Sequence, residues 1–177
     1  DVLNPREFEL FSLELSENPN TLVIYSDEDK IDGSDKHFEL YCKPDYSPEL
    51  LLTQMYLCHF TCFRAREVRA VGGFRSQFDG AQDFDLALRL LPQLSEDNVH
   101  HVPRPLYHWR AWAQSTALTI DAKPWAQEAS ARAQQDHLDR MVGGTVVASS
   151  VPGLNEVHPA VPSPPLVSVI IPTAGAA

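Results

Sequence analysis

The sequence predicts an α/β fold, and three observations carry that prediction. The chain opens with apolar residues at helical spacing, Phe8, Phe11 and Leu15. A short apolar and β-branched segment, residues 21–25, follows and is typical of a buried strand. That strand leads directly into an acidic segment, residues 26–33, which we expect to be a loop. A helix, a buried strand and a polar loop in this order are typical of α/β proteins.

The first helix carries start and stop signals. Asn4 is the expected N-cap, Pro5 occupies the first helical position, and Glu7 stands where a capping box has its glutamate. Asn18, Pro19 and Asn20 end the pattern.

The following elements are short and alternate between the two types. We expect helices over residues 47–55, 64–72, 83–91 and 124–141. Strands are expected over residues 59–63, 99–102 and 106–109.

The domain organisation follows from the change in composition after residue 141. The 177 residues are too few for two independent cores. Residues 1–141 form one unit, and residues 142–165, rich in small residues, proline and valine, are expected to be a linker. Residues 166–177 begin with a strong buried-strand pattern, which needs neighbouring strands. We therefore expect them to start a second domain that the chain does not complete.

Composition excludes several classes of protein. A net charge of −10 argues against binding to the phosphate backbone of nucleic acids. Three cysteines make no disulfide framework, which indicates a reducing, cytosolic compartment. No apolar run approaches the roughly 20 residues that span a bilayer. Because no signal sequence follows Asp1, we expect the chain to be processed or cut from something longer.

The acidic segment has two interpretations. Asp27, Asp29 and Asp32 resemble a calcium loop, but the EF-hand register then puts Phe38 at the closing glutamate, so that assignment fails. A solvated turn is the common explanation of such a run. Against it, carboxylates crowded at the end of a buried strand repel one another unless a cation or ligand lies nearby. The residues alone leave both interpretations open.

Asp83 also has two interpretations, which are compatible. It can be the N-cap of the helix that follows. It can equally be a general base, since a carboxylate on a rigid helix start can take a proton from a hydroxyl group. Asp85 is expected to be structural or to pair with Arg89 four residues later.

Histidines and cysteines give weaker signals. His100 and His101 alternate across a strand and cannot face one metal together. Cys58 and Cys62 lack a second pair at zinc spacing, so we expect the cysteines to be small core residues. In the segment 107–110, an aromatic side chain and a guanidinium could contact a ligand that carries rings and phosphates, although an ordinary edge strand explains it equally well.

Taken together, the segments resemble the family-2 glycosyltransferases of GT-A fold, particularly bacterial enzymes that build surface polysaccharides such as O-antigen. The motifs occur in the family's order and lie at residues 24–32, 43–48, 72–75, 82–89 and 106–110, followed by Ser115 and Thr116. Residues 167–173 look like the first strand of another such domain.

The resemblance implies a partial GT-A fold, Rossmann-like, with a mixed sheet flanked by helices. It implies inverting transfer of a sugar from a nucleotide-diphosphate donor to a glycan or lipid-linked acceptor. Asp83 would be the general base, and a divalent metal, Mg²⁺ or Mn²⁺, would stabilise the leaving diphosphate. The other implied site residues are Asp27, Glu28, Asp29 and Arg110 for the donor, Gly73, Phe74 and Gln82 for the acceptor, and Asp1 and His108 for the metal.

The resemblance also implies a cytoplasmic enzyme, with possible peripheral attachment of the full-length protein to the inner face of the membrane. Since the nucleotide-binding half would precede Asp1, we expect this chain alone to be inactive. We expect Asp27, Asp29 and Asp83 to open into one cleft, and residues 167–171 could pair with residues 21–25 and replace a missing strand. Other function classes remain open: a non-catalytic carbohydrate-binding or interaction module, or a metal-dependent hydrolase.

Overall fold

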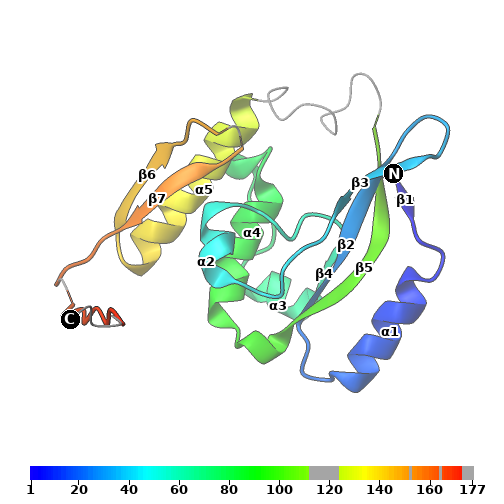
Figure 1. Cartoon of the computed structure of the whole chain (residues 1–177), viewed down its shortest axis with the longest axis horizontal. Coiled ribbons are helices and arrows are strands. Elements are labelled where there is room, and N and C mark those ends of the chain that lie inside the picture. Colours follow the sequence, from blue (N-terminus) through cyan, green and yellow to red (C-terminus); the bar gives the residue numbers. More distant parts are fainter. Residues whose placement is uncertain (112–123, 152, 164, 173–177) are drawn as a thin grey trace, which may run out of the picture.

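The computed structural model describes residues 1–111, 124–151, 153–163 and 165–172, and shows a mixed sheet flanked by helices (Figure 1). The helices are α1 (Glu7–Glu17), α2 (Pro48–Thr53), α3 (Ala65–Ala70), α4 (Gln82–Leu90) and α5 (Pro124–Met141). The strands are β1 (Val2–Leu3), β2 (Val23–Ile31), β3 (His37–Tyr41), β4 (Thr61–Phe63), β5 (Val99–Arg110), β6 (Gly144–Ala148) and β7 (Asn155–Pro159). Short 3₁₀ turns lie at Ser76–Phe78, Leu91–Gln93 and Glu96–Asn98. Ser115, Thr116 and residue 173 lie outside the described residues.

Strand β2 is the centre of the main sheet. Strand β5 runs parallel to it on one side, while β3 and β4 pair antiparallel with its two halves on the other side. Strand β1 pairs with the outer edge of β5. The α/β class, the mixed sheet and the central place of the segment 21–25 are therefore confirmed.

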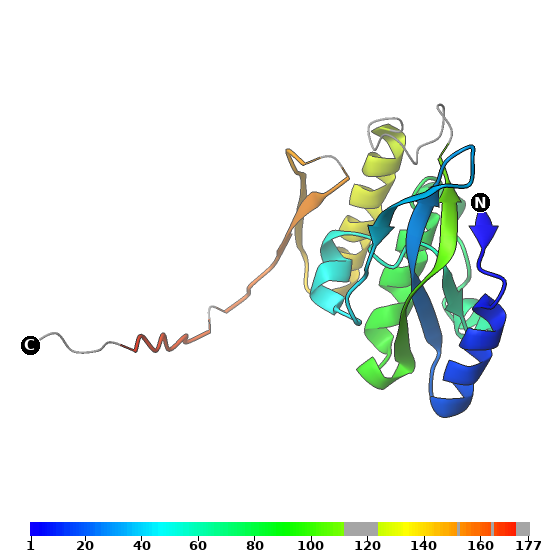
Figure 2. The same cartoon turned by 45° about the vertical axis from the view of Figure 1, so that its right-hand side comes forward.

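The two faces of the sheet pack against different helices, as Figures 1 and 2 show. Val23 and Tyr25 point to the side covered by α2, α4 and α5 and belong to the larger core. Ile24, between them in sequence, packs with Phe11 of α1 on the other face. Because successive strand residues point to opposite faces, a strand buried on both sides is apolar without alternation, as residues 22–25 are.

The acidic segment is part of strand β2 and not the expected loop. Strand β5 pairs with β2 as far as Ile31, and β3 pairs with it from Glu28 onward. Asp27, Glu28 and Asp29 are buried. Histidines and a lysine from neighbouring segments surround these carboxylates, so tertiary contacts override the local preference of acidic residues for a loop.

The two strands expected over residues 99–102 and 106–109 are one continuous strand, β5. Pro103 and Pro105 lie where the register with β2 shifts, between Ser26 and Asp27 and again before Glu28. Such irregularities tolerate proline, which has no N–H to give to a strand ladder.

The prediction of a capping box at the start of α1 is wrong. The helix begins at Glu7 with Arg6 as N-cap, and Asn4 instead accepts from the Arg6 N–H through Oδ1 (3.0 Å). The Glu7 side chain is fully buried, and neither carboxyl oxygen has a hydrogen-bond partner among the described residues. Burial raises the pKa of Glu7 to about 7.

Replacing Glu7 with glutamine should remove a pH-dependent loss of stability. The folded pKa of about 7 lies above the unfolded value, so the contribution of Glu7 to stability is most favourable below about pH 4.5 and is lost as pH rises toward 7. Glu7→Gln should therefore match the wild type at pH 4.5 and be more stable by about 1–3 kcal/mol at pH 8. Urea unfolding at both pH values measures this. An equal difference at the two pH values would show that Glu7 ionises normally in the folded protein.

Residues 142–165 are not a structureless linker, because they contain the hairpin of β6 and β7. The hairpin packs on α5 through the fully buried Gln134, whose Oε1 accepts from Asn155 Nδ2 (2.7 Å). Gln134 Nε2 also donates to the carbonyls of Leu52 and Thr53 at the end of α2. These bonds join the hairpin to the unit that precedes it, while the domain boundaries as a whole stay a prediction.

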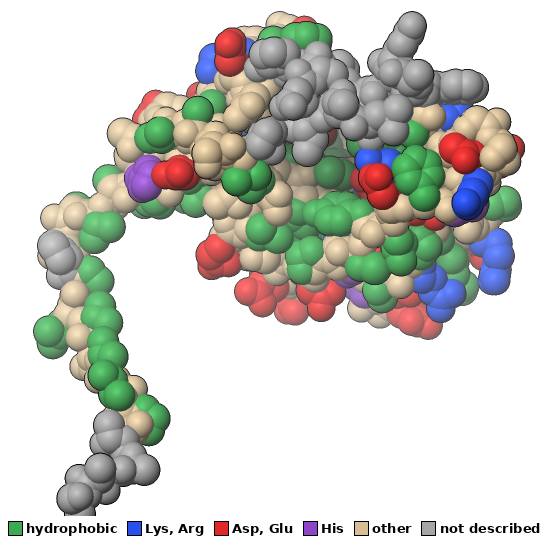
Figure 3. Space-filling view, turned by 45° about the horizontal axis from the view of Figure 1, so that its top comes forward, with side chains coloured by type: hydrophobic (Ala, Val, Ile, Leu, Met, Phe, Trp, Pro, Cys, Tyr) green, Lys and Arg blue, Asp and Glu red, His purple; other side chains and the backbone are tan. Residues whose placement is uncertain are grey.

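The proposed pairing of residues 167–171 with residues 21–25 is wrong. Residues 166–171 are exposed and form no strand, and the segment extends away from the body of the molecule (Figures 2 and 3). The physical reason is that Val23–Tyr25 already pairs with β4 on one edge and β5 on the other. No edge is left for a further strand.

Candidate functional site

Strands β2, β3 and β5 bring one carboxylate and two imidazoles together. Asp29 lies directly opposite His108 in the parallel pair, and its Oδ1 is 2.6 Å from His108 Nδ1. His37 of β3 approaches from the other side, with Nδ1 2.8 Å from Asp29 Oδ2. The two imidazole rings meet edge to face at 4.6 Å. We call Asp29, His37 and His108 the Asp-His-His cluster.

The Asp-His-His cluster has ligand atoms that fit a metal ion. One potential ligand atom of each residue lies within 4.8 Å of the others. Asp29 is buried, His108 half-buried and His37 exposed, so the cluster is open on one side. Two imidazole nitrogens and one carboxylate suit a transition metal such as Mn²⁺ better than Mg²⁺, which prefers an all-oxygen shell.

The sequence assigned Asp29 to the donor and His108 to the metal, and it gave no role to His37. The signal that could have found it is the turn of residues 32–36, whose Asp-Gly-Ser-Asp sequence favours a hairpin. In the structure, Asp32 N donates to Lys36 O and His37 returns opposite Ile31, beside Asp29.

Asp1 is not a member of the cluster. Its Oδ2 accepts from the Tyr107 hydroxyl (2.8 Å) and its Oδ1 from the backbone N–H of Arg110 (3.1 Å). Tyr107 and His108 are successive residues of a strand, so their side chains leave it on opposite faces. The assignment of Asp1 as a metal ligand stays a prediction.

The other acidic residues of β2 are held by protein groups. Asp27 Oδ1 accepts from Lys43 N (2.8 Å) and lies 2.9 Å from His101 Nε2. His101 in turn stacks on Tyr25. His100 points the other way, toward Glu14, so the two neighbouring histidines do not share a site, as the sequence predicts.

Glu28 is tied to two segments at once. Its Oε2 accepts from the buried Lys43 Nζ (3.2 Å) and from the backbone N–H of His59 (2.7 Å). Burial alone raises the pKa of the Glu28 carboxyl, but the His59 hydrogen bonds and the Lys43 charge outweigh it, and the pKa is lowered overall. Glu28 is therefore a buried, ionised carboxylate.

Arg110 lies at the end of β5, next to the turn that connects β2 and β3. Its Nη1 is 2.8 Å from Asp35 Oδ1 and donates to the carbonyl of Asp32 (3.3 Å). Asp35 is exposed, so this pair can open to a phosphate without loss of a buried contact.

A pocket of about 430 Å³ lies beside Asp83. Asp83, Gln82 and Phe74 line it, and the remaining walls come mainly from the segment around β4: Met55, Cys58, His59, Phe60, Thr61, Phe63 and Leu86. Asp83 and Gln82 are exposed, and the Phe74 side chain is 65 % exposed. An exposed carboxylate, an amide and an open aromatic ring can together bind a hydroxylated ligand.

Asp83 is not the N-cap of its helix. Helix α4 begins at Gln82 after Ala81, so Asp83 lies in the first turn, and its Oδ1 accepts from the Phe84 N–H (2.9 Å). A carboxylate in the first turn still interacts favourably with the helix dipole. One carboxylate oxygen is therefore held by the helix start, and the residue lines the pocket.

The expected single cleft for Asp27, Asp29 and Asp83 is not observed. Asp29 and Glu28 line a separate hollow of about 320 Å³ between β2 and β3, and neither Asp27 nor Asp29 lines the Asp83 pocket. Glu28 lines the first hollow and accepts a hydrogen bond from the backbone N–H of His59, which lines the second.

Buried charges hold the loop that carries Gly73 and Phe74. Asp85 bonds to Arg75 and Arg89, and Arg89 Nη2 also donates to the carbonyl of Gly73 (2.6 Å). The expected pair of Asp85 and Arg89 is confirmed at 2.7 Å. Gly73 precedes Phe74 in this loop but does not line the pocket, and its assignment to the acceptor stays a prediction.

The cysteines form no metal site with other described residues. Cys42 is exposed, so the expectation of a core residue is wrong there, while Cys58 and Cys62 are half-buried. Burial, helped by the charges of Glu28 and Asp83, raises the pKa of the Cys58 thiol to about 12. Because little of the Cys58 thiol is then present as the reactive thiolate, Cys58 is an unreactive residue in the wall of the Asp83 pocket.

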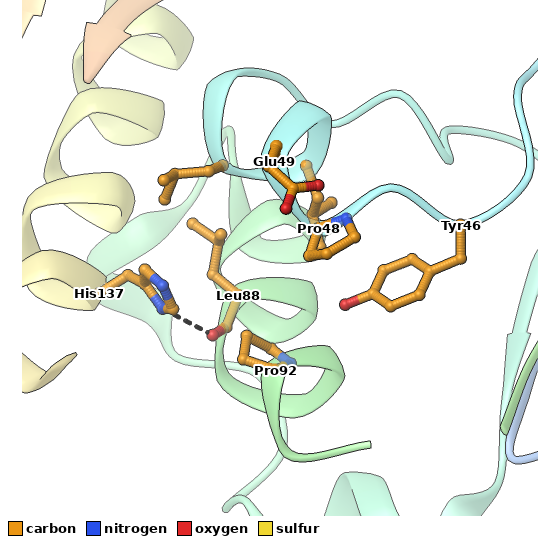
Figure 4. Close-up of a pocket in the computed structure, with 8 residues that line it drawn as sticks. Tyr46, Pro48, Glu49, Leu88, Pro92 and His137 are labelled. Carbon is orange, nitrogen blue, oxygen red and sulfur yellow. Dashed lines mark hydrogen bonds between the residues drawn. The ribbon is translucent and has the colours of Figure 1, made fainter. Parts of the chain in front are cut away.

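A smaller pocket of about 230 Å³ lies among α2, α4 and α5 (Figure 4). His137 Nδ1 faces the Leu88 carbonyl there (3.0 Å), and Tyr46, Pro48 and Pro92 contribute to its walls. Its walls are mostly apolar, and the residues that the sequence assigns to a site do not line it.

Comparison with known proteins gives two relatives of much greater length. No protein-family profile matches the chain. The chain is 38% identical over 175 residues to "Uncharacterized protein y4gI" of Sinorhizobium fredii, an alignment that covers 98% of the chain and 19% of the relative. It is 35% identical over 172 residues to "O-antigen biosynthesis protein RfbC" of Myxococcus xanthus, covering 97% of the chain and 13% of the relative. The chain therefore spans less than a fifth of either relative.

Helices that could cross a membrane are absent from the part of the chain that the structure describes.

Proposed function

We propose that this chain is part of a family-2 glycosyltransferase of GT-A fold that acts in cell-surface polysaccharide synthesis. The observation that carries the substrate class is the similarity of nearly the whole chain to a protein named for O-antigen biosynthesis. The chemistry is supported by two features of the described residues, an exposed carboxylate in the wall of a pocket and a separate metal-compatible cluster on the central strands. The proposal includes the expected cytoplasmic location and peripheral membrane attachment.

The acceptor belongs in the Asp83 pocket. The Phe74 ring offers a flat apolar face for the C–H face of a sugar ring, and Gln82 and Asp83 offer groups that bind hydroxyls. Asp83 takes the proton of the attacking hydroxyl, whose oxygen forms a bond to the anomeric carbon as the bond to the diphosphate breaks. The acceptor is a glycan or a lipid-linked glycan.

The donor belongs near β2 and β5. Asp29, His37 and His108 would hold a divalent metal, which would supply positive charge to the leaving diphosphate. Arg110 leaves its exposed partner Asp35 to pair with the donor phosphates, which a guanidinium binds well. Glu28 keeps the wall between donor and acceptor rigid through Lys43 and His59.

Mn²⁺ should bind to the Asp-His-His cluster of the 177-residue chain. Removing one of three protein ligands should weaken binding strongly, so we expect His108→Ala to raise the Mn²⁺ dissociation constant at least tenfold, or by about 1.4 kcal/mol. Titration followed by the electron paramagnetic resonance signal of free Mn²⁺ measures this.

The matched control for this titration is His100→Ala. His100 lies on the same strand but faces Glu14 on the other side of the sheet, so its removal should leave Mn²⁺ affinity unchanged. Equal affinity of the wild type and His108→Ala would contradict the metal site.

A further inference from the structure

His59 is held in place by contacts with three other segments. Its backbone N–H donates to Glu28 Oε2 (2.7 Å), and its carbonyl accepts from Lys43 Nζ. The imidazole ring stacks on Tyr107 at 4.8 Å with an interplanar angle of 16° and lies 5.3 Å from the Trp109 ring. Both the backbone and the ring plane of His59 are therefore fixed before any ligand binds.

The two nitrogens of this ring lie in different surroundings. Nδ1 is buried without a hydrogen-bond partner among the described residues, and its nearest charged atom is Glu28 Oε2 at 3.5 Å. The side chain as a whole is nevertheless 43 % exposed and lines the Asp83 pocket. Nε2 is not among the buried, unpartnered side-chain atoms of the described residues, so solvent reaches it.

The free ring nitrogen can bind a hydroxyl group in either tautomer, because a hydroxyl both donates and accepts hydrogen bonds. Nε2 makes no hydrogen bond to another described residue. The wall of the pocket thus includes a rigidly held imidazole with a ring nitrogen that the fold itself does not use.

We propose that His59 contacts the ligand of the Asp83 pocket, with Nε2 hydrogen-bonded to a hydroxyl group of a neutral sugar. This inference rests on the proposed function, which makes the ligand of the pocket a carbohydrate. Asp83 and His59 then bind the sugar from two walls, one on α4 and one before β4. Glu28 and Lys43 are positioning residues for His59, because they contact its backbone and the buried edge of its ring.

Nitrogen NMR of the histidine side chains in the 177-residue chain tests the contact. The probes are methyl α-glucoside, methyl α-galactoside and methyl α-mannoside, each added to saturation. We expect at least one probe to shift the His59 Nε2 signal and the backbone signals of Phe74 and Asp83 together. The signals of His137, which lies in the separate pocket among the helices, should not move.

Two variants separate binding from packing. His59→Phe keeps an aromatic ring against Tyr107 but removes both nitrogens, and should weaken binding of the active probe roughly three- to tenfold, the worth of one hydrogen bond. His158→Phe makes the same exchange on the exposed hairpin and should leave binding unchanged.

Each outcome decides between the alternatives. If a probe moves Phe74 and Asp83 while His59 Nε2 stays still, or if His59→Phe binds it as the wild type does, the inference for His59 is wrong and the proposed function survives. If none of the three probes moves a pocket signal, the inference is also overturned. Transfer by the full-length protein is measured separately, so a failure of the proposed function appears there and not in these titrations.

Discussion

Asp83→Asn should lower the turnover number for sugar transfer by the full-length protein by about 10²–10⁴-fold, the usual contribution of a general base. Asparagine has nearly the same shape and keeps the oxygen that accepts from the Phe84 N–H, so helix α4 should stay intact. It cannot take a proton from the acceptor hydroxyl. Steady-state kinetics with saturating donor and acceptor measure the effect, and donor affinity should change little.

The matched control is Asp79→Asn. Asp79 is exposed, lies four residues before Asp83 and does not line its pocket. This variant should keep wild-type turnover. Near-normal turnover in Asp83→Asn would show that this carboxylate supports the helix start and does no chemistry.

Asp85→Ala should destabilise the fold by about 3–5 kcal/mol, because it leaves a buried guanidinium without its partner. The Asp85 side chain is 1 % exposed, and that of Arg89 is 7 % exposed. Burial raises the pKa of Asp85, but the hydrogen bonds and charges of Arg75 and Arg89 outweigh it and lower the pKa overall. The carboxylate therefore stabilises the fold above its unfolded pKa of about 4 and ceases to do so as pH falls through the lower folded value.

Asp136→Asn is the control for this prediction. Asp136 also pairs with Arg75, at 2.7 Å, but its side chain is one-third exposed, so its loss should cost no more than about 1 kcal/mol. Urea unfolding at pH 7 measures both variants. If Asp85→Ala and Asp136→Asn lost the same free energy of unfolding, burial of the Asp85 ion pair would add nothing to its contribution to stability.

Local sequence patterns were enough to predict much of the fold. The strand of residues 21–25 and the helix starting near Asp83 carry apolar patterns that depend only on their own periodicity, and both are confirmed. The pair of Asp85 and Arg89 was also predictable, since it follows from helical spacing alone.

Features that depend on distant segments were not predictable. Residues 26–31 are strand because Lys43, His101 and other groups up to 79 positions away along the chain partner their carboxylates. Glu7 is buried and not a cap because α1 turns that residue toward the sheet. His37 joins the Asp-His-His cluster through the hairpin of β2 and β3, and no local sequence pattern predicts the register of that hairpin. Periodicity describes one element at a time, whereas each of these features is set by a second element.

Acceptor-dependent release of nucleoside diphosphate by the full-length protein tests whether this chain belongs to an enzyme that transfers sugars. A panel of nucleotide-diphospho-sugars is incubated with the protein, with and without a lipid-linked glycan fraction, in the presence of Mn²⁺ or of a chelator. We predict that at least one donor releases its nucleoside diphosphate only when both acceptor and metal are present. Release at the same rate without acceptor would indicate a hydrolase. No release from any donor under any condition would contradict the proposed sugar-transfer function.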